Sequence, residues 1–465
     1  SRWREKIRFS DQQSLQEGEH EGIPFVEFRP TGVFPFSSAY AFSGDCLLFL
    51  VSPLRAGDQL AEALALVRKK GRGASLASLP GFQGMSGSLP AVSSPRLFCY
   101  LRTDRLAALW GGGALVGIEA PGVKEWQGLE AHLRQRIGVT RALGGAVWLK
   151  QGLRGWLRRE LDLEKVKEIY GEKLLSLWRP PSRRFAALRF APADAAGVWA
   201  GTGDFPLLWE RARIEWRMLA PLLDESARND LEGAKREMAR AVETDLLPWL
   251  GDEAAILLNR LASPGLLPLP DAALAIRVKD EAAAARGVEK LVAAWIGSRP
   301  IVPVKSRRGG REITSLPVAP FFQPAWTLAE GYLIAGTSAA TVEKTIGLFG
   351  KEGGGLLQDR DFERVTAVVP PEGERFLYLA AARLGDEVAQ IVRWWASLTT
   401  AKGEGGGGET LLSPEEVIGT LQPWGRLKAL AIRARTQQNI VIEDFYWYSE
   451  EESFSGGVSG KARQR

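Results

Sequence analysis

Residues 246–295 constrain the fold most, because they contain a complete strand–turn–strand–helix unit. Two short apolar runs, residues 254–258 and 272–278, are separated by a proline-rich connection. Short apolar runs between turn residues are typical of strands, and Ala, Glu and Lys at helical spacing are typical of a helix. We therefore expect two strands, followed by a helix over residues 281–295 that begins after the capping residue Asp280.

Other parts of the chain repeat this order of elements. Three segments, which begin at Arg96, Arg184 and Arg375, each combine a basic residue, an apolar strand, an acidic residue near a helix start and a tryptophan. A second pair of strand–helix units also matches. Chance similarity between short units is the alternative explanation. If the repeat is real, the chain consists of two related halves, residues 24–180 and 183–449.

The length of 465 residues corresponds to two to four domains of roughly 100–200 residues each. Pro180 and Pro181 would stop a helix and stiffen a linker, so we place the domain boundary there. The polar residues 1–23 are expected to form an arm, and residues 450–465 a flexible tail. The expected fold class is α+β, with two related halves and mainly antiparallel sheets, each covered on one face by helices.

Three further segments carry local patterns that decide the type of element. Residues 153–175 have an apolar stripe at helical spacing and are expected to form one long amphipathic helix. Residues 185–190 are expected to form a strand, and residues 194–199 the helix that follows it in the repeat. Residues 353–372 are expected to be loop and turn.

Residues 427–434 and 440–448 alternate in polarity on either side of a polar turn, which predicts a C-terminal β-hairpin. The second strand contains an aromatic run of Phe445, Tyr446, Trp447 and Tyr448. We expect this strand to lie at a sheet edge, where unpaired backbone groups and aromatic side chains would bind a partner protein. The glycine- and serine-rich loop over residues 71–95 is the other candidate contact surface.

Composition argues against several classes of function. Hydrophobic residues make up 45% of the chain and charged residues 25%, with a net charge of +5, which is typical of a globular protein with a real core. Basic and acidic residues are interleaved, whereas a nucleic-acid binder concentrates its basic residues on one face. The two histidines, His20 and His132, are far apart in sequence, which argues against a histidine-dependent hydrolase or a zinc enzyme.

Two short motifs resemble catalytic signatures and fail them. Residues 84–88 resemble a nucleophile elbow, but Ser88 stands where that pattern requires glycine. The glycines at residues 111–113 lack both the spacing of a dinucleotide-binding loop and the Lys-Ser/Thr pair of a phosphate loop. We therefore predict no catalytic residues, no metal site and no cofactor.

The two cysteines, Cys46 and Cys99, exclude a Cys-x-x-Cys site. Both lie in strand-like runs, and we expect those strands to belong to one N-terminal sheet. One interpretation is two buried thiols. The other is a cross-strand disulfide, which requires an oxidising compartment and a short distance between the two residues.

One set of sequence features resembles a known family. It comprises residues 246–257 with their Pro-Trp-Leu-Gly-Asp-Glu run, the strand and helix that follow residue 270, the Glu330-Gly331 turn with its second strand, residues 356–362, Pro370 and residues 376–379. Over about residues 183–400 the chain resembles an uncharacterised bacterial domain-of-unknown-function family of secreted or membrane-anchored envelope proteins. The resemblance implies an extracytoplasmic location, periplasmic or outer envelope, and association with a membrane. It supplies no catalytic residues.

No apolar run approaches the ~20 residues that a membrane-spanning helix needs. The sequence begins at Ser1 and not at Met, so a signal or anchor would lie upstream of it. Membrane anchoring through a segment missing from the N-terminus is therefore one expectation.

Three functions follow, in order of preference. The first is a non-catalytic extracytoplasmic scaffold or binding subunit whose partners are other proteins of an envelope assembly. The second is a carrier for an apolar ligand, which a pocket of a few hundred Å³ lined by Trp and Leu would favour. The third is a carboxylate-dependent hydrolase that uses a pair such as Asp252 and Glu253 or Asp359 and Asp361; two facing carboxyls with raised pKa values would favour it.

Overall fold

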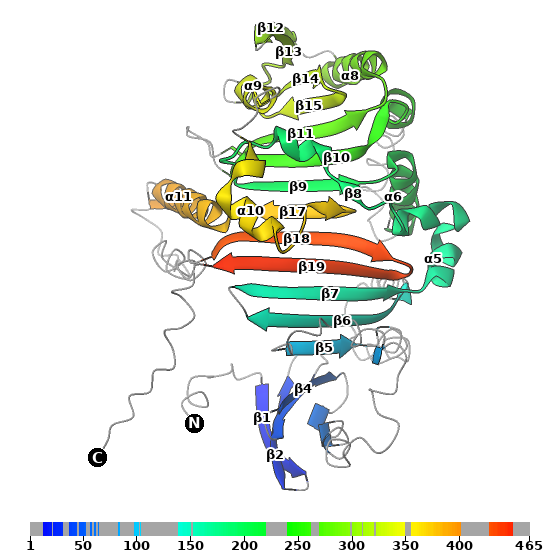
Figure 1. The fold of residues 1–465 in the computed structure, drawn as a ribbon, viewed down its shortest axis with the longest axis vertical. Helices are drawn as coiled ribbons and strands as arrows, with labels where there is room; N and C mark the ends of the chain where they lie inside the picture. Colours follow the sequence, from blue (N-terminus) through cyan, green and yellow to red (C-terminus); the bar gives the residue numbers. More distant parts are fainter. Residues whose placement is uncertain are drawn as a thin grey trace. The chain divides into compact units, whose positions relative to one another are not determined.

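A computed structural model shows the fold of the chain (Figure 1). It describes residues 13–20, 22–30, 37–43, 46–52, 97–101, 138–149, 152–219, 240–261, 269–297, 300–308, 310–319, 322–348, 355–400 and 427–449, with isolated positions at 56–57, 60–61, 64, 82–83 and 103. The chain forms two compact units, Ser1–Val92 with Tyr100–Gly138, and Ser93–Cys99 with Val139–Arg465. The expected tail, residues 450–465, lies outside the described residues, as does most of the loop at 71–95.

The first unit contains a four-stranded antiparallel sheet in sequence order. Its strands are β1 (Gln13–His20), β2 (Ile23–Pro30), β3 (Ser37–Ser43) and β4 (Cys46–Ser52). Ala39 and Ala41 pack with Leu60 and Leu64 in a small core. Residues 1–23 were expected to form a polar arm, but residues 13–20 are the sheet strand β1, which pairs along its whole length with β2.

The second unit contains a thirteen-stranded sheet, and every adjacent pair from β12 to β6 is antiparallel. In spatial order its strands are β12 (Val304–Arg308), β13 (Arg311–Ser315), β14 (Ala325–Ala329), β15 (Tyr332–Gly336), β11 (Asp271–Val278), β10 (Leu250–Arg260), β9 (Gly197–Thr202), β17 (Arg375–Leu379), β18 (Leu427–Gln437), β19 (Ile440–Ser449), β7 (Leu153–Leu161), β6 (Thr140–Leu149) and β5 (Leu97–Leu101). The short strands β8 (Arg183–Arg184) and β16 (Glu372–Gly373) pair separately.

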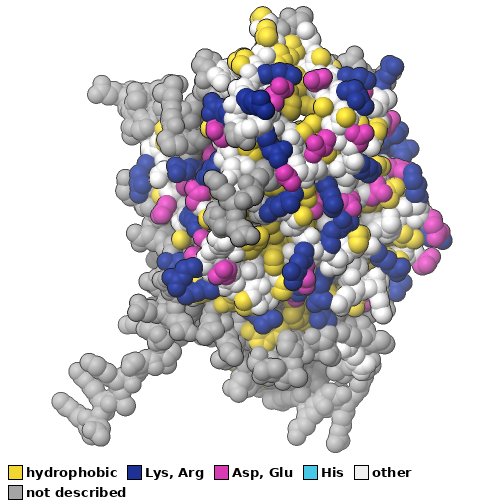
Figure 2. Space-filling view, turned by 45° about the horizontal axis from the view of Figure 1, so that its top comes forward, with side chains coloured by type: hydrophobic (Ala, Val, Ile, Leu, Met, Phe, Trp, Pro, Cys, Tyr) yellow, Lys and Arg dark blue, Asp and Glu magenta, His cyan; other side chains and the backbone are white. Residues whose placement is uncertain are grey.

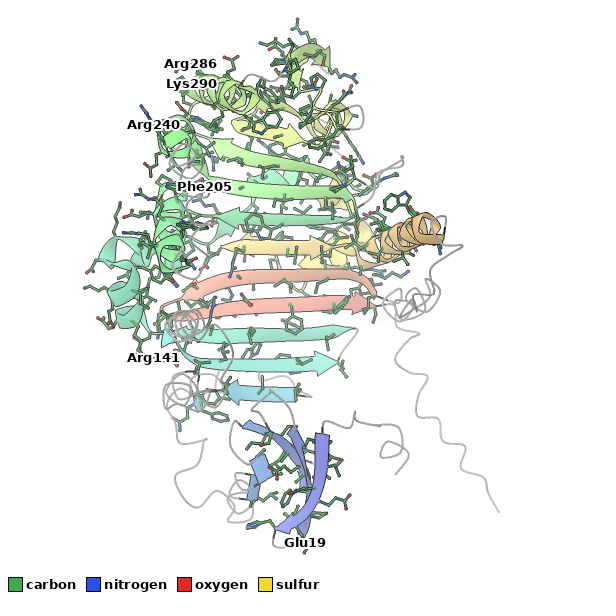
Figure 3. The ribbon with its side chains drawn as sticks, turned by 180° about the vertical axis from the view of Figure 1, so that it is seen from behind. Glu19, Arg141, Phe205, Arg240, Arg286 and Lys290 are labelled. Carbon is green, nitrogen blue, oxygen red and sulfur yellow. The ribbon has the colours of Figure 1, made fainter. Side chains whose placement is uncertain are left out.

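Helices lie on both faces of this sheet. They are α5 (Leu163–Tyr170), α6 (Phe205–Leu219), α8 (Glu281–Ile296), α9 (Ala339–Ile346), α10 (Arg360–Thr366) and α11 (Ala381–Thr400), with 3-10 turns η2 (Glu172–Trp178), η3 (Ala186–Phe190) and η6 (Leu356–Gln358) and a π turn η5 (Val242–Leu246). On the front face, which Figure 1 shows, η3, α9 and α10 cover part of the sheet. On the back face, which Figure 3 shows, α5, α6 and α8 lie at one end of the strands.

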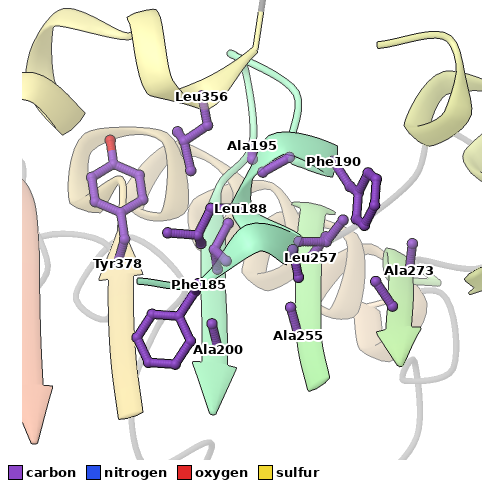
Figure 4. Packing of buried hydrophobic residues seen from close by; sticks show 14 of the residues in the cluster. Phe185, Leu188, Phe190, Ala195, Ala200, Ala255, Leu257, Ala273, Leu356 and Tyr378 are labelled. Atoms are coloured by element: carbon purple, nitrogen blue, oxygen red, sulfur yellow. The ribbon is translucent and has the colours of Figure 1, made fainter. Parts of the chain in front are cut away.

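The main hydrophobic core lies on the front face (Figure 4). Ala200 of β9, Ala255 of β10 and Phe376 of β17 occupy paired positions in the sheet, and all three are fully buried. Small alanines on the central strands leave room for the larger Phe185, Leu188 and Phe190 around η3, which cover them. This alternation of small and large residues fixes η3 on the sheet.

Several local predictions are confirmed. The two strands of residues 246–295 are β10 and β11, which pair with each other, and the helix is α8. The carboxylate of Asp280 caps α8 by accepting hydrogen bonds from the backbone N–H groups of Ala282 and Ala283. The hairpin β14–β15 turns at Glu330 and Gly331, both with positive φ, as a two-residue hairpin turn requires.

The fold-class prediction of two α+β halves, each with its own helix-covered sheet, is wrong. One sheet runs through the second unit and contains strands from both sides of Pro180 and Pro181: β5 to β7 precede the prolines, and β9 to β15 and β17 to β19 follow them. Sheet hydrogen bonds therefore cross the expected boundary. The proline pair is a connection between elements of one sheet.

The repeat also fails at its second copy. After Arg184 the chain forms the 3-10 turn η3 and not a strand, and residues 197–202 form β9 and not a helix. The helix expected over residues 153–175 is the strand β7 followed by α5. The segment 353–372, expected to be loop, contains the helix α10.

The C-terminal hairpin is confirmed as β18 and β19, which turn after Gln437. The expectation that its second strand is a sheet edge is wrong. β19 pairs with β18 on one side and with β7 on the other, from Ile440↔Glu160 to Trp447↔Leu153. Its backbone groups are therefore already used inside the sheet.

Candidate functional site

The acidic pairs considered for hydrolysis do not form facing carboxyls. Asp252 and Glu253 are adjacent on β10, and successive side chains of a strand point to opposite faces. Asp252 forms ion pairs with Arg183 at 2.8 Å and Arg277 at 3.8 Å. Glu253 is 1% exposed on the front face. The two acids therefore have separate structural roles.

Glu253 holds η3 against the sheet. Its carboxylate accepts hydrogen bonds from the backbone N–H of Ala187 at 2.7 Å and from the hydroxyl of Tyr332 at 3.0 Å. Burial, together with the charge of Glu253, raises the pKa of the Tyr332 hydroxyl far above its usual value, so Tyr332 remains a donor. The Arg189 guanidinium lies 5.8 Å from the centre of the Tyr332 ring. The group is a satisfied structural network.

Asp359 acts in the same way at α10. Its carboxylate caps the helix by accepting from the Phe362 N–H at 2.9 Å, and it forms an ion pair with Arg383 at 2.6 Å. Arg383 also donates to the backbone carbonyls of Ala193 and Ala195. This arrangement joins α10, α11 and the loop before β9. Asp361 lies in the first turn of α10, two residues after Asp359, a spacing at which helical side chains do not face each other.

A pocket of about 710 Å³ lies on the back face, between α8 and strands β12–β14. One wall is a stripe of α8, where Val288, Val292 and Ile296 follow one another at intervals of four residues. Trp326 and Leu328 of β14 form the floor. The volume is within the range of about 300–1,000 Å³ that is typical of small-molecule sites.

Four charged side chains line the pocket, namely Glu289, Lys305, Arg311 and Glu312, and three of them form ion pairs. Lys305 and Glu312 form an ion pair at 2.9 Å, and Arg311 binds Glu330 at 2.7 Å. The pocket therefore combines an apolar interior with a rim where both cationic side chains are paired with acids. Over the rest of the described surface in view, basic and acidic side chains are interleaved in the same way (Figure 2).

Beyond the pocket, the back face carries two rows of apolar residues that run across the strands. The first row crosses seven strands and consists of Leu258, Gly197, Leu379, Leu430, Trp447, Leu153 and Leu149. The second row crosses the same strands and consists of Ile256, Trp199, Leu377, Ile432, Phe445, Gly155 and Val147. We call these two rows the apolar strip.

The apolar strip is not buried. Ile256 is 47% exposed, Trp199 38% and Leu149 54%, and every other side chain of the strip larger than glycine is partly exposed. Their immediate neighbours on the front face, such as Leu257 and Tyr378, are fully buried. Figure 3 shows the middle of this face with no described helix over it, because α5, α6 and α8 stand at one end of the strands.

Glycines allow the aromatic rings of the strip to lie flat. A Cβ at Gly155 would fall 2.4 Å from the Phe445 ring and 2.6 Å from the carbonyl oxygen of Ala146. A Cβ at Gly201 would fall 2.8 Å from the ring of Trp199. Each ring therefore rests on the backbone of a glycine in its own or the adjacent strand.

The predicted contact residues divide between the two faces. Phe445 and Trp447 belong to the apolar strip, and Tyr446 is buried in the front core. Tyr448 packs against that core, and its ring and hydroxyl contact Arg364. The four aromatic residues thus do not form one surface. The sequence signal for the strip was present in strands such as β17, whose residues are apolar on both faces.

The cysteines do not share a sheet. Cys46 begins β4 of the four-stranded sheet, and Cys99 lies in β5 of the thirteen-stranded sheet. Both are on strands as predicted, but the expected common sheet is wrong. The thiol of Cys99 is free and exposed, which also contradicts its interpretation as a buried thiol. The structure gives no support to a bond between the two residues.

Comparisons with protein-family models, with curated proteins and with solved structures find no match to this chain. In the part of the chain that the structure describes, no three His, Cys, Asp or Glu side chains gather in a way that could hold a metal ion. None of the described helices is both long and apolar enough to cross a bilayer.

Proposed function

We propose that this protein is a non-catalytic binding protein for an apolar ligand, and that the ligand occupies the pocket under α8. The observation that carries the proposal is the pocket itself, about 710 Å³ in volume, with Trp326, Leu328 and a valine–isoleucine stripe around it. A Trp- and Leu-lined pocket of this size is the feature that distinguishes a carrier from a hydrolase. The facing carboxyls that a hydrolase needs are not found at Asp252 and Glu253 or at Asp359 and Asp361.

The lining favours a ligand with a hydrocarbon body. Burial of apolar surface contributes roughly 25 cal/mol per Å², so a lining of this kind binds hydrocarbon without needing a directed polar contact. Because Lys305 and Arg311 are already paired with acids, they offer no uncompensated charge to a strongly ionic ligand. A fatty acid or a similar single-chain amphiphile, with its polar head at the rim, fits this chemistry.

A protein scaffold was the preferred function from sequence, and its expected contact surface was the edge strand of the C-terminal hairpin. β19 is an interior strand, so its edge is not available to a partner strand. The scaffold function therefore stays a prediction. The family resemblance supports the further proposal that the protein works outside the cytoplasm, in association with a membrane of the cell envelope.

Two neighbouring alanines of α8 provide a matched test. Ala293 and Ala294 are both exposed, but only Ala293 lines the pocket. Dodecanoate is titrated into the wild type, Ala293→Trp and Ala294→Trp, and binding is measured by calorimetry. We expect Ala293→Trp to fill the pocket and weaken binding about tenfold or more, equivalent to ~1.4 kcal/mol.

Ala294→Trp adds the same indole outside the pocket and should bind dodecanoate like the wild type. Unfolding temperatures of the two variants show whether each remains folded. Failure of the wild type to bind both dodecanoate and an uncharged hydrocarbon probe would refute the proposal. Equal weakening in the two variants would place the ligand elsewhere.

A further inference from the structure

The pocket and the apolar strip are parts of one continuous row. Trp326, on the pocket floor, pairs with Ala335 of β15, which pairs with Leu274 of β11, which pairs with Ile256 of the strip. Ala335 and Leu274 are partly exposed and are not part of the core that α8 covers. A hydrocarbon that leaves the pocket toward β10 therefore meets apolar side chains at every strand.

The size of the strip indicates what covers it. Seven strands about 4.8 Å apart span roughly 29 Å, and two rows occupy about 14 Å along the strands, so the strip covers on the order of 400 Å². A specific protein interface buries about 800 Å² on each partner. The strip is thus about half the size that a protein partner needs.

The chemistry of the strip also favours a hydrocarbon occupant over a protein. Protein interfaces form about one hydrogen bond per 100–200 Å². The side chains of the strip are aliphatic or aromatic, and the indole N–H groups of Trp199 and Trp447 are their only polar groups. An occupant without hydrogen-bonding groups along its length, which is a hydrocarbon chain, matches this surface.

Three helices stand beside the strip on this face. α5, α6 and α8 lie at one end of the strands and leave the middle of the face without a described helix over it (Figure 3). A single lipid chain can lie along the strip next to them.

We infer that the ligand is a two-chain lipid, with one hydrocarbon chain in the pocket under α8 and the second chain along the apolar strip. The inference rests on the proposed function, because the pocket anchors the first chain. The inference adds two things to the proposed function: the class of ligand, and the apolar strip as a second binding surface.

The test compares two ligands that differ by one chain. The 465-residue chain is incubated with palmitoyl lysophosphatidylcholine or with dipalmitoyl phosphatidylcholine in the same mild detergent, and the bound lipid is quantified by native mass spectrometry. We expect the two-chain lipid to bind about tenfold more tightly or better, which corresponds to ~1.4 kcal/mol. The head group and the first chain are identical, so the difference reports the second chain.

A matched pair of variants locates that chain. Ile256→Asp places a charge in the strip, and Leu357→Asp places one at a residue of similar exposure on η6, outside it; the two side chains are 47% and 49% exposed. Ile256→Asp should remove most of the advantage of the two-chain lipid and leave the lysolipid unaffected. Leu357→Asp should change neither. If Ile256→Asp does not fold, Trp199→Ala replaces it, because it removes apolar surface from the same strip and should also reduce the advantage of the two-chain lipid.

The outcomes separate the two proposals. If the lysolipid binds, Ala293→Trp blocks it and the second chain adds nothing, the pocket is confirmed and this inference is overturned. If the two-chain lipid binds better but Ile256→Asp and Trp199→Ala have no effect, the second chain does not use the strip and the inference is again overturned. If dodecanoate binds but neither phosphatidylcholine lipid does, this inference is overturned and the proposed function stands; if none of the three binds, both fail. Saturable binding of a protein to the strip in place of lipid would also overturn the inference.

Discussion

Glu253 illustrates how one buried carboxylate can be structural. Its two acceptor contacts, to the Ala187 N–H and the Tyr332 hydroxyl, join η3 to β10 and β15. From sequence alone, an acidic pair at Asp252 and Glu253 suggested hydrolysis as one alternative. The burial of Glu253, the alternation of the strand and the ion pairs of Asp252 give each acid a separate partner. None of these three facts can be read from residue types.

We expect Glu253→Ala to destabilise the protein by about 2–6 kcal/mol, because it leaves a buried N–H and a buried O–H without an acceptor at about 1–3 kcal/mol each. Tyr332→Phe removes one donor and leaves the Ala187 bond intact, so it should cost less, about 1–2 kcal/mol. Urea denaturation measures both. A larger loss in Tyr332→Phe than in Glu253→Ala would contradict this account of the site.

At the scale of elements, the sequence predicted what local signals determine. The cap Asp280, the helix α8 and the turn at Glu330 and Gly331 depend on neighbouring residues, and all three are found as expected. β7 was missed because its apolar residues also fit a helical stripe. Its pairing with β6 and β19 decides its conformation, and that pairing depends on distant residues.

The 3-10 turn η3 was missed for a related reason. An apolar run after Arg184 is typical of a strand, but the buried acceptor on β10 holds the Ala187 N–H out of any strand ladder. The pocket was partly predictable: the stripe at Val288, Val292 and Ile296 is visible as an apolar helix face. The strands that complete the pocket come from residues 304–328, and nothing in the sequence joins them to that face.

Substitution of two glycines tests whether the aromatic rings of the strip depend on the glycines beneath them. Gly155→Ala would bring a Cβ within 2.6 Å of the Ala146 carbonyl oxygen and within 2.4 Å of the Phe445 ring, so we expect it to destabilise by about 1–3 kcal/mol. Gly385→Ala in α11 is the control, since no atom lies within 4 Å of its added Cβ. It should stabilise by roughly 0.5–1 kcal/mol through helix propensity. Thermal and urea unfolding measure both, and a neutral Gly155→Ala would show that the ring is free to move.

At the scale of the whole molecule, the order of strands was the feature hidden from sequence. β19, the last described strand, pairs with β7, which lies almost three hundred residues earlier. Alternation identified both segments of the hairpin correctly, but alternation does not identify a strand's second neighbour. The division into halves at Pro180 and Pro181 followed local linker chemistry, whereas the sheet continues across it.

The continuity of the sheet predicts how fragments of the chain behave. A fragment of residues 183–449 corresponds to the half expected from sequence, but it lacks β6 and β7. The loss of β7 would expose the full edge of β19, from Ile440 to Trp447, next to the apolar strip. A long apolar edge strand promotes aggregation. A fragment of residues 139–449 keeps β6 and β7 and loses only the five-residue edge strand β5 of this sheet, so it is the control.

We expect the fragment 139–449 to be monomeric and to unfold cooperatively, and the fragment 183–449 to aggregate or to melt roughly 10 °C lower or more. In domains of about 150–250 residues, ~1 kcal/mol shifts the melting temperature by about 2–4 °C, so the loss of eight paired residues and their packing is sufficient for such a change. Size-exclusion chromatography and circular dichroism measure the two properties. If the fragment 183–449 is monomeric and melts with the fragment 139–449, then β7 contributes little to β19, and Pro180 and Pro181 mark a domain boundary after all.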